Sequence, residues 1–411
     1  MQTNLADFIR DTADGREADA ILRKCVHCGF CTATCPTYQL LGDEQDSPRG
    51  RIYLIKQALE GAEVTAKTQL HLDRCLTCRS CETTCPSGVE YARLADIGRR
   101  IVEERVGRSP WQSAQRWMLS AVLPTTWLFG ALLALGRSVR WALPAALAAK
   151  IPAAADAAGP WPAARHTRRM IVLAGCVQPA LAPAINAAAA RVLDKVGISL
   201  VEAPGAGCCG AVRFHLNRQE AGKDDMRALI DAWWPMVESG AEAIVMTASG
   251  CGMTVREFGH LLKDDPAYAA KAARISGMTR DLSEVLDGER ALLEKALSGR
   301  VGEKGKAAFH SPCSLQHGQQ LRGRIEPLLE TAGYDLTAVP EAHLCCGSAG
   351  TYSILQPELS LRLRANKLAA LHTGAPAVIA TANIGCLTHL QSGTQTSVVH
   401  WIQLVDRRLA A

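Results

Sequence analysis

Two stretches of this chain repeat one spacing of cysteines, and this repeat limits the possible folds more than any other feature. Each stretch reads C-x2-C-x2-C-x3-C-P, and the second begins fifty positions after the first. Cysteines at such short, regular intervals supply thiolates to metal centres. The repeat therefore predicts a pair of related metal centres in the N-terminal part of the chain.

Iron–sulfur clusters fit this spacing best. In two-cluster bacterial ferredoxins, three thiolates of such a run bind one [4Fe-4S] cluster and the fourth reaches across to the other. Crossed ligation holds two one-electron carriers close together, so we expect the chain to transfer electrons. The predicted ligands are Cys25, Cys28, Cys31 and Cys85 for one cluster and Cys75, Cys78, Cys81 and Cys35 for the second.

Zinc and disulfides are the alternatives for these cysteines. Paired C-x2-C motifs also form tetrahedral zinc sites, but zinc does not require the third cysteine or the Cys-Pro that both runs contain. Disulfides are disfavoured because residues 1–15 carry acids where a secretory peptide needs cations and an apolar core. We therefore expect iron–sulfur centres in a reducing cytoplasm.

A helix start is predicted between the two cysteine runs. Residues 47–52 read Ser-Pro-Arg-Gly-Arg-Ile, in which a serine cap precedes a proline at the first helical position. Arg49 and Arg51 in this segment are available to offset the negative charge of the clusters.

The other eight cysteines form a second repeat. In each copy a first cysteine precedes a Cys-Cys-Gly triplet by thirty-two residues, and a last cysteine follows. We expect these cysteines to provide further redox or metal sites, with buried packing or a strained, redox-active disulfide as the alternatives. They are Cys176, Cys208, Cys209 and Cys251 in the first copy and Cys313, Cys345, Cys346 and Cys386 in the second.

Each copy of the second repeat has an α/β pattern. Apolar runs lead into the first and last cysteines, and helical stretches lie between them. Because ligands collect at the carboxyl ends of parallel strands, the four cysteines of a copy can meet in one crevice. The expected strands cover 171–176, 243–247, 307–313 and 377–381, and the expected helices 183–195, 224–238, 324–331 and 357–371.

A glycine pattern in the first copy resembles a dinucleotide site. Residues 205–210 match G-x-G-x-x-G, but residues 341–347 of the other copy keep the cysteines and lack the first two glycines. No acidic residue stands clearly about twenty positions on to hold a ribose. We therefore expect this chain to carry electrons without binding the organic cofactor that supplies them.

The segment between the two repeats has a different composition. Residues 111–169 hold five of the eight tryptophans, and seven cations against the single acid Asp156. Such a mixture suits contact with anionic lipid headgroups or a partner, and no nucleic-acid-reading motif accompanies it. Residues 117–136 are uncharged and long enough to cross a bilayer, but Pro124 interrupts them. A peripheral contact with a membrane or a partner is therefore favoured over a crossing, and an ordinary buried helix is the other alternative.

These patterns predict an α+β multidomain protein. A helical two-cluster ferredoxin-like domain covers 1–105, and a Trp-, Arg- and Ala-rich helical connector follows over 106–168. Two α/β Cys-Cys-Gly repeats, in a pseudo-two-fold arrangement, cover 169–300 and 301–411.

Taken together, the ordered motifs resemble the iron–sulfur subunits of membrane-associated 2-hydroxyacid dehydrogenases, with the greatest likeness to those of bacterial glycolate oxidases. The likeness extends over nearly the whole chain and is weakest in the connector. It is carried above all by residues 23–38, 47–56, 208–211, 344–351 and 381–386.

The resemblance implies a complex at the inner face of the cell membrane. Flavoprotein subunits would oxidise glycolate to glyoxylate, and this chain would pass electrons from the flavin towards the membrane quinone pool. D-lactate and glycerol 3-phosphate are the alternative substrates, and a heterodisulfide-reductase-like thiol–disulfide enzyme is the alternative activity. The wider Cys-Cys-Gly family usually ends each unit with C-x2-C, whereas Cys251 and Cys386 stand alone, so clusters in the two repeats are in doubt.

Overall fold

The computed structural model describes residues 1–144, 148, 151–152, 156–300 and 305–410. Its chain forms two compact units, one made of Met1–Trp117 with His343–Lys367 and the other of Met118–Ala342 with Leu368–Ala411. The predicted domain start at residue 301 and the connector cation Lys150 lie outside the described residues.

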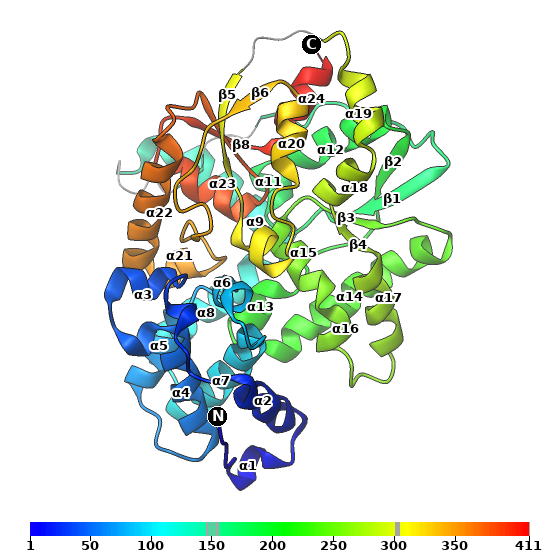
Figure 1. The fold of residues 1–411 in the computed structure, drawn as a ribbon. Helices are drawn as coiled ribbons and strands as arrows, with labels where there is room; N and C mark the ends of the chain where they lie inside the picture. The colour runs from blue at the N-terminus through cyan, green and yellow to red at the C-terminus, as the bar shows by residue number, and fades with distance from the viewer. Residues whose placement is uncertain (145–147, 149–150, 153–155, 301–304, 411) are drawn as a thin grey trace. The chain divides into compact units, whose positions relative to one another are not determined.

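The first unit is helical in its described part (Figure 1). Helices α8 (Pro110–Val122) and α22 (Pro357–His372) run from this unit into the other. The elements of the first unit are α1 (Asp7–Arg10), α2 (Ala13–Lys24), η1 (Phe30–Thr32), α3 (Pro36–Leu41), η2 (Glu44–Asp46), α4 (Pro48–Leu59), α5 (Ala66–Asp73), α6 (Ser80–Thr84), α7 (Tyr91–Val106) and α21 (Tyr352–Leu355).

Helix α4 begins where the sequence predicts. The Ser47 hydroxyl accepts a hydrogen bond from the Gly50 N–H at 3.0 Å, which satisfies one of the free N–H groups of the first turn. Helix α7 packs closely against α4 because Gly98 has no side chain, and a Cβ there would lie 2.5 Å from Ile55. This packing supports the cysteine loops that precede and follow the two helices.

The second unit contains two four-stranded parallel sheets with the same strand order, β2-β1-β3-β4 and β6-β5-β7-β8. The equal order confirms that residues 169–411 contain an α/β repeat. The strands are β1 (Arg168–Val172), β2 (Ile198–Glu202), β3 (Ile244–Met246), β4 (Thr279–Asp281), β5 (Gly305–His310), β6 (Tyr334–Leu336), β7 (Val378–Thr381) and β8 (Ser397–His400).

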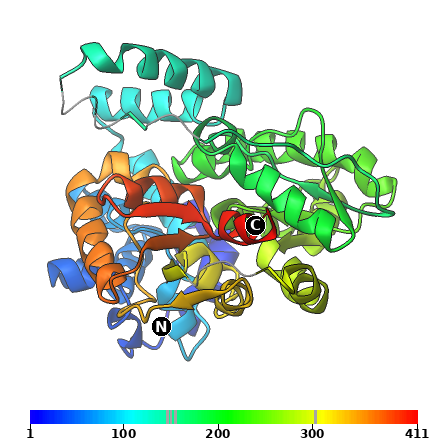
Figure 2. The same cartoon turned by 90° about the horizontal axis from the view of Figure 1, so that it is seen from above.

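Helices pack on these sheets, and Figure 2 shows the second repeat in yellow to red. The four helices predicted from the sequence are present as α12, α14, α20 and α22. The elements of the second unit besides its strands are α9 (Thr126–Val139), η3 (Arg140–Ala142), α11 (Gln178–Leu181), α12 (Ala184–Lys195), α13 (Ala211–His215), α14 (Gln219–Glu238), α15 (Ser249–Arg256), α16 (Phe258–Leu261), α17 (Ala269–Met278), α18 (Leu282–Gly288), α19 (Arg290–Leu297), η4 (Ser314–Gly318), α20 (Ile325–Thr331), α23 (Ile384–Gln391) and α24 (Trp401–Ala410).

The two repeats share one apolar core. Ile185 and Leu193 of the first repeat belong to the same buried cluster as Ile402 and Val405 of the second. Helix α12 packs against α24 there, and at its edge Arg191 donates two hydrogen bonds to Asp406, at 3.0 and 2.6 Å. The second unit is therefore built by both repeats together.

The tryptophan-rich connector forms helices α8 and α9, with Pro124 in the break between them. Among the described residues, no single helix is long and apolar enough to cross a membrane. Helices α8 and α9 meet that criterion only as a pair, and the pair is bent by 105°. The interruption predicted at Pro124 is thus present in the structure.

Candidate metal centres

Two cavities in the first unit gather the cysteines of the two runs. The second cavity is lined by Cys35, Cys75, Cys78 and Cys81, and the first by Cys25, Cys28, Cys31 and Cys85 together with Cys81. Each lining thus includes the three cysteines of one run and the fourth of the other that crossed ligation requires. Pro48, Cys81 and Tyr91 line both cavities, so the two sites are neighbours.

The backbone takes the same unusual form in both runs. His27 and Gly29 have φ angles of 55° and 85°, and Thr77 and Arg79, at the equivalent places, have 52° and 59°. Left-handed conformations are costly for residues other than glycine, and above all for a β-branched threonine. The turn directs the Thr77 N–H to the sulfur of Cys75 at 3.4 Å. The strained left-handed backbone thus occurs where it can direct N–H groups to a cysteine sulfur.

The two cavities differ in exposure. In the first, Cys28 is exposed, and the neighbouring side chains Val26 and Phe30 are 68% and 63% exposed. In the second, Cys35 and Cys81 are both buried. A group bound in the first cavity would consequently lie nearer to solvent.

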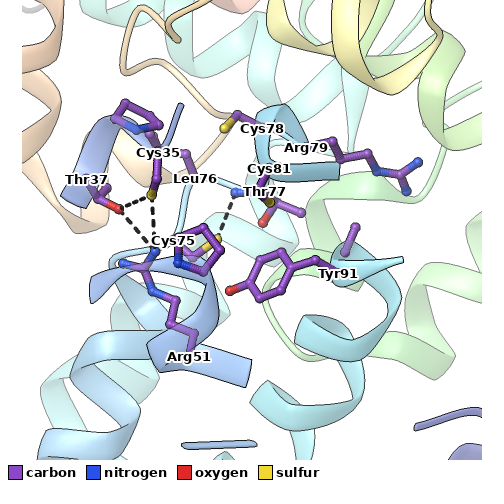
Figure 3. Close-up of a pocket in the computed structure, with 13 residues that line it drawn as sticks. Cys35, Thr37, Arg51, Cys75, Leu76, Thr77, Cys78, Arg79, Cys81 and Tyr91 are labelled. Atoms are coloured by element: carbon purple, nitrogen blue, oxygen red, sulfur yellow. Dashed lines mark hydrogen bonds between the residues drawn. The ribbon is translucent and has the colours of Figure 1, made fainter. Parts of the chain in front are cut away.

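The buried side chain of Arg51 lies beside the cysteines of the second cavity (Figure 3) and belongs to an ion-pair network. Arg51 is 1% exposed, and its guanidinium lies 4.0 Å from the sulfur of Cys35. It donates to the Thr37 hydroxyl at 3.1 Å and to Asp46 at 3.2 Å. Asp46 is fully buried and also accepts from Arg74 at 2.9 Å. Two guanidinium groups thus share one carboxylate beside the predicted ligands.

Arg99 of α7 is a second buried cation at this cavity. It donates to the carbonyl oxygens of Leu72 and Cys75, at 2.9 and 2.6 Å, and to the Thr77 hydroxyl at 2.9 Å. Burial alone would raise the pKa of the Cys75 thiol, but Arg51 and Arg99 outweigh it and hold this pKa below its usual value. Positive charge therefore favours a thiolate at Cys75.

Other thiols lack this stabilisation. Burial raises the pKa of Cys31 in the first cavity to about 11. In the second cavity, burial and the neighbouring thiols raise the pKa of Cys81 well above its usual value. Arg49, which faces the first cavity, is partly exposed and paired with Glu44 at 2.5 Å. Electrostatic support is thus concentrated on the Cys35 and Cys75 side of the second cavity.

The first Cys-Cys-Gly motif brings its four cysteines into contact. The thiols of Cys176 and Cys209 hydrogen-bond to the sulfur of Cys208, and Cys209 also contacts Cys251. These contacts lower the pKa of Cys208, and the Gly210 N–H adds a hydrogen bond to its sulfur at 3.4 Å. The four cysteines of this repeat thus lie together, and their use as a redox or metal site stays a prediction.

Two charged residues lie beside these four cysteines. Arg213 forms an ion pair with Asp225 and donates to the Ser120 carbonyl at 3.1 Å. Burial, together with the negative charge of Cys208, raises the pKa of Asp225 to about 6.

The second Cys-Cys-Gly motif repeats the local geometry. The Gly347 N–H donates to the sulfur of Cys345 at 3.4 Å, as Gly210 does to Cys208. Cys345 and Cys346 are buried in the first unit, whereas Cys313 and Cys386 belong to the second.

The segment 343–367 packs onto the cysteine runs within the first unit. Tyr352 donates its hydroxyl to the carbonyl oxygen of Arg74, the residue before Cys75, at 3.2 Å. Arg362 donates to the carbonyl oxygen of Leu40 at 3.1 Å. The side of the second cavity near Cys75 is therefore covered by a segment far away in the sequence.

Sequence reasoning identified Arg51 but missed other residues of these centres. Arg99, Asp46 and Tyr91 lie in ordinary helical or capping contexts that carry no metal signature. Tyr352 lies 277 positions from Cys75, and one sequence gives no signal of such a contact. The spacing of cysteines in the sequence identifies candidate metal ligands. The positions of the charged side chains around those ligands depend on tertiary packing.

Comparisons with known proteins agree with this geometry. Residues 21–89 match the 4Fe-4S dicluster domain family, and residues 170–256 and 307–391 match the cysteine-rich domain family. The chain is 58% identical over 409 residues to the glycolate oxidase iron-sulfur subunit of Escherichia coli (strain K12), covering 100% of this chain and 99% of that protein. The chain belongs to the family of glycolate oxidase iron–sulfur subunits. The matched domains of this family member fit an electron-transfer role.

Two further relatives extend the comparison. The probable glycolate oxidase iron-sulfur subunit of Bacillus subtilis (strain 168) is 30% identical over 431 residues, covering 95% of this chain and 94% of that protein. The lactate utilization protein A of Bacillus licheniformis is 27% identical over 233 residues, which are 54% of this chain and 93% of that protein. The family assignment thus rests on full-length likeness, and the shorter relative matches only part of the chain.

Proposed function

We propose that this chain is the electron-transfer subunit of a flavin-dependent complex that oxidises glycolate to glyoxylate and delivers electrons to the membrane quinone pool. The observation that carries the proposal is that the eight cysteines line two neighbouring cavities, each with three cysteines of one run and the fourth of the other, and Cys81 borders both. Thiolate sets of this kind fit two [4Fe-4S] clusters, which supply one-electron chemistry. Cys25, Cys28, Cys31 and Cys85 would hold one cluster, and Cys35, Cys75, Cys78 and Cys81 the other.

The metal content tests this assignment directly. The chain, purified without oxygen, is expected to contain about eight irons and eight acid-labile sulfides, with the EPR signature of two interacting clusters on reduction. Zinc in place of iron, or only about four irons, would contradict the assignment. Distinctly more than eight irons would place additional clusters in the Cys-Cys-Gly repeats.

The partner and the substrate need a second experiment. We expect the chain to co-purify with FAD-containing subunits, and glycolate to bleach the cluster absorption of that complex. The lactate-related name of one relative makes D-lactate the informative competitor, with glycerol 3-phosphate as a further comparison. Bleaching by D-lactate and not by glycolate would overturn the substrate assignment.

A thiol–disulfide activity at the first Cys-Cys-Gly motif is the second candidate, supported by the contacts that favour a thiolate at Cys208. It predicts disulfide reduction by the isolated chain, which the double substitution Cys208→Ser with Cys209→Ser would abolish. Our primary proposal predicts that the same double variant keeps both clusters in the first unit reducible. Absence of disulfide reduction in the unchanged chain would remove this candidate.

We also propose a peripheral location on the inner face of the membrane. Helix α9 supports it because none of its residues is buried, and Trp127 and Leu135 are 74% and 60% exposed. Arg137 and Arg140 at the end of this helix add the cations that anionic headgroups attract.

A further inference from the structure

The two predicted cluster sites are surrounded by cations of very different accessibility. At the second site, the Arg51 guanidinium is buried 4.0 Å from the Cys35 sulfur, and the buried Arg99 donates to the Cys75 carbonyl. At the first site, Arg49 is partly exposed and its charge is paired with Glu44. The Met1 ammonium also donates to the Cys25 carbonyl at the first site, at 2.8 Å. The second site therefore differs in having two buried guanidinium groups, whereas the guanidinium at the first site is partly exposed.

Buried charge acts more strongly on a cluster than exposed charge does. Reduction adds one negative charge, and a nearby cation stabilises it by an energy that grows as the local dielectric constant falls. Solvent and salt screen an exposed cation such as Arg49. Cluster potentials respond to net charge, hydrogen bonds and solvent exposure, so these two environments favour different potentials.

Acidic groups near the second site do not remove this difference. Asp46 is shared between Arg51 and Arg74, which leaves two guanidinium groups for one carboxylate. Glu82, next to Cys81 in the chain, faces Arg79 at 4.0 Å. Arg99 adds a further buried cation to this side.

We propose that Arg51 and Arg99 give the cluster site of Cys35, Cys75, Cys78 and Cys81 the higher reduction potential, so that electrons enter at the site of Cys25, Cys28, Cys31 and Cys85 and settle at the other. This inference rests on the proposed function, since it assumes a cluster at each site. The transfer moves one electron from a reduced to an oxidised cluster, with the flavin partner as reductant, and no bond is made or broken.

The exposure of the two sites supports the same order. Electron donors must approach closely, and the exposed Cys28, flanked by the exposed Val26 and Phe30, offers that approach. Cys35 is buried, and Tyr352 contacts the Arg74 carbonyl beside Cys75. An electron supplied from outside the first unit therefore meets the first site more readily.

A redox titration of the isolated chain, followed by EPR, tests this order. Chemical reductants replace the partner, so the result is independent of glycolate oxidation. Two separate potentials are expected in the unchanged chain. Replacing one ligand in each site assigns them: Cys28→Ser should keep the higher potential, and Cys78→Ser should lose it. Equal potentials, or loss of the higher one in Cys28→Ser, would overturn the proposal.

Substitutions of single arginines test whether buried positive charge causes the difference between the two reduction potentials. Arg51→Gln and Arg99→Gln should each move the potential of the second site to more negative values and leave the first unchanged. Arg49→Gln is the matched control and should shift the first site by less. An equally large shift in Arg49→Gln would show that burial does not set the difference.

Two other results can be told apart from a failure of this proposal. If Arg51→Gln loses its cluster because Asp46 is left with a single guanidinium partner, Arg99→Gln and the titration of the unchanged chain still decide the question. If the complex fails to respond to glycolate while the two potentials differ as expected, only the substrate proposal fails. If the chain contains no iron, both fail together.

Discussion

At the scale of single residues, the two Cys-Cys-Gly motifs depend on the absence of a side chain. Gly210 and Gly347 have φ angles of 82° and 89°, in the left-handed region that favours glycine. A Cβ at these positions would lie 2.4 Å from the carbonyl oxygen of Gly222 and 2.6 Å from that of Ser360. Each glycine thus allows a helix to approach the cysteine loop and directs an N–H to a sulfur.

Gly210→Ala is therefore expected to destabilise the second unit. The left-handed conformation alone costs about 1 kcal/mol or more for alanine, and the contact with Gly222 adds to it. The thermal unfolding midpoint of the variant should fall clearly. Gly207→Ala is the control, because a Cβ at Gly207 would meet no atom within 4 Å and its φ is not left-handed. Equal midpoints for the two variants would contradict this account.

The residues that sequence reasoning could identify are those with a fixed spacing. The sixteen cysteines and Arg51 belong to local motifs, so one sequence was enough to select them as candidates, and their roles stay predictions. Asp46 and Arg99 reach the second cavity through the packing of η2 and α7, which local sequence does not specify. The charge around a metal site is therefore harder to predict than its ligands.

At the scale of elements, helix α9 stands out because it exposes apolar side chains along its length. Trp127, Leu132, Leu135 and Val139 are all at least 40% exposed. Such a surface is costly in water unless something covers it. With Arg137 at its end, the helix has the composition of a segment that lies in a lipid interface.

Substitutions on α9 should weaken binding to lipid vesicles. Trp127→Ser and Leu135→Ser each remove a large apolar side chain. We expect each substitution to lower the affinity for vesicles that contain anionic lipid by about tenfold, as measured by co-sedimentation. Higher salt should weaken binding further, because headgroup attraction is screened. Leu292→Ser on α19, where the leucine is 44% exposed, is the control. Unchanged binding in both α9 variants would argue against a lipid contact through this helix.

Elements with long apolar or helical patterns could be predicted, and strands without an apolar run could not. The strands before Cys176 and Cys251 have recognisable apolar runs, and helix α14 starts five residues before the predicted position. Strands β4 and β8 were missed because Thr279–Asp281 has no apolar residue and Ser397–His400 has only two, so neither forms the apolar run that marked β3 and β7. Both lie at sheet edges, where β4 pairs with β3 and β8 with β7.

At the scale of the whole molecule, a buried histidine joins the two repeats of the second unit. His400, at the end of β8, is fully buried, and its Nε2 donates to the Thr247 carbonyl oxygen at 2.8 Å. Its Nδ1 accepts from the Ile402 N–H at 3.3 Å. These partners fix the neutral tautomer, and burial lowers the pKa of His400 to about 4.

This histidine predicts an acid-sensitive junction between the repeats. The folded state keeps His400 neutral, while the unfolded chain binds a proton below about pH 6.5. The stabilisation of the folded state by neutral His400 is therefore complete above about pH 6.5 and is lost as the pH falls towards about 4. We expect the thermal midpoint of the second unit to fall between pH 7.5 and pH 5.5.

The variant His400→Gln separates this residue from other acid effects. Glutamine can donate to the Thr247 carbonyl oxygen but cannot bind a proton in this range. It should be less stable than the unchanged chain at pH 7.5, and its midpoint should change less between the two pH values. Parallel pH profiles for the two proteins would show that His400 does not control the acid response.

The division of the chain into units has a consequence for how the protein is made. Residues 1–117 leave the ribosome first, but residues 343–367, which complete the same unit and place Tyr352 against the Arg74 carbonyl, emerge only after most of the second unit. The cysteine runs are thus synthesised early and covered late. Until residues 343–367 have been synthesised, the side of the second cavity near Cys75 lacks this cover.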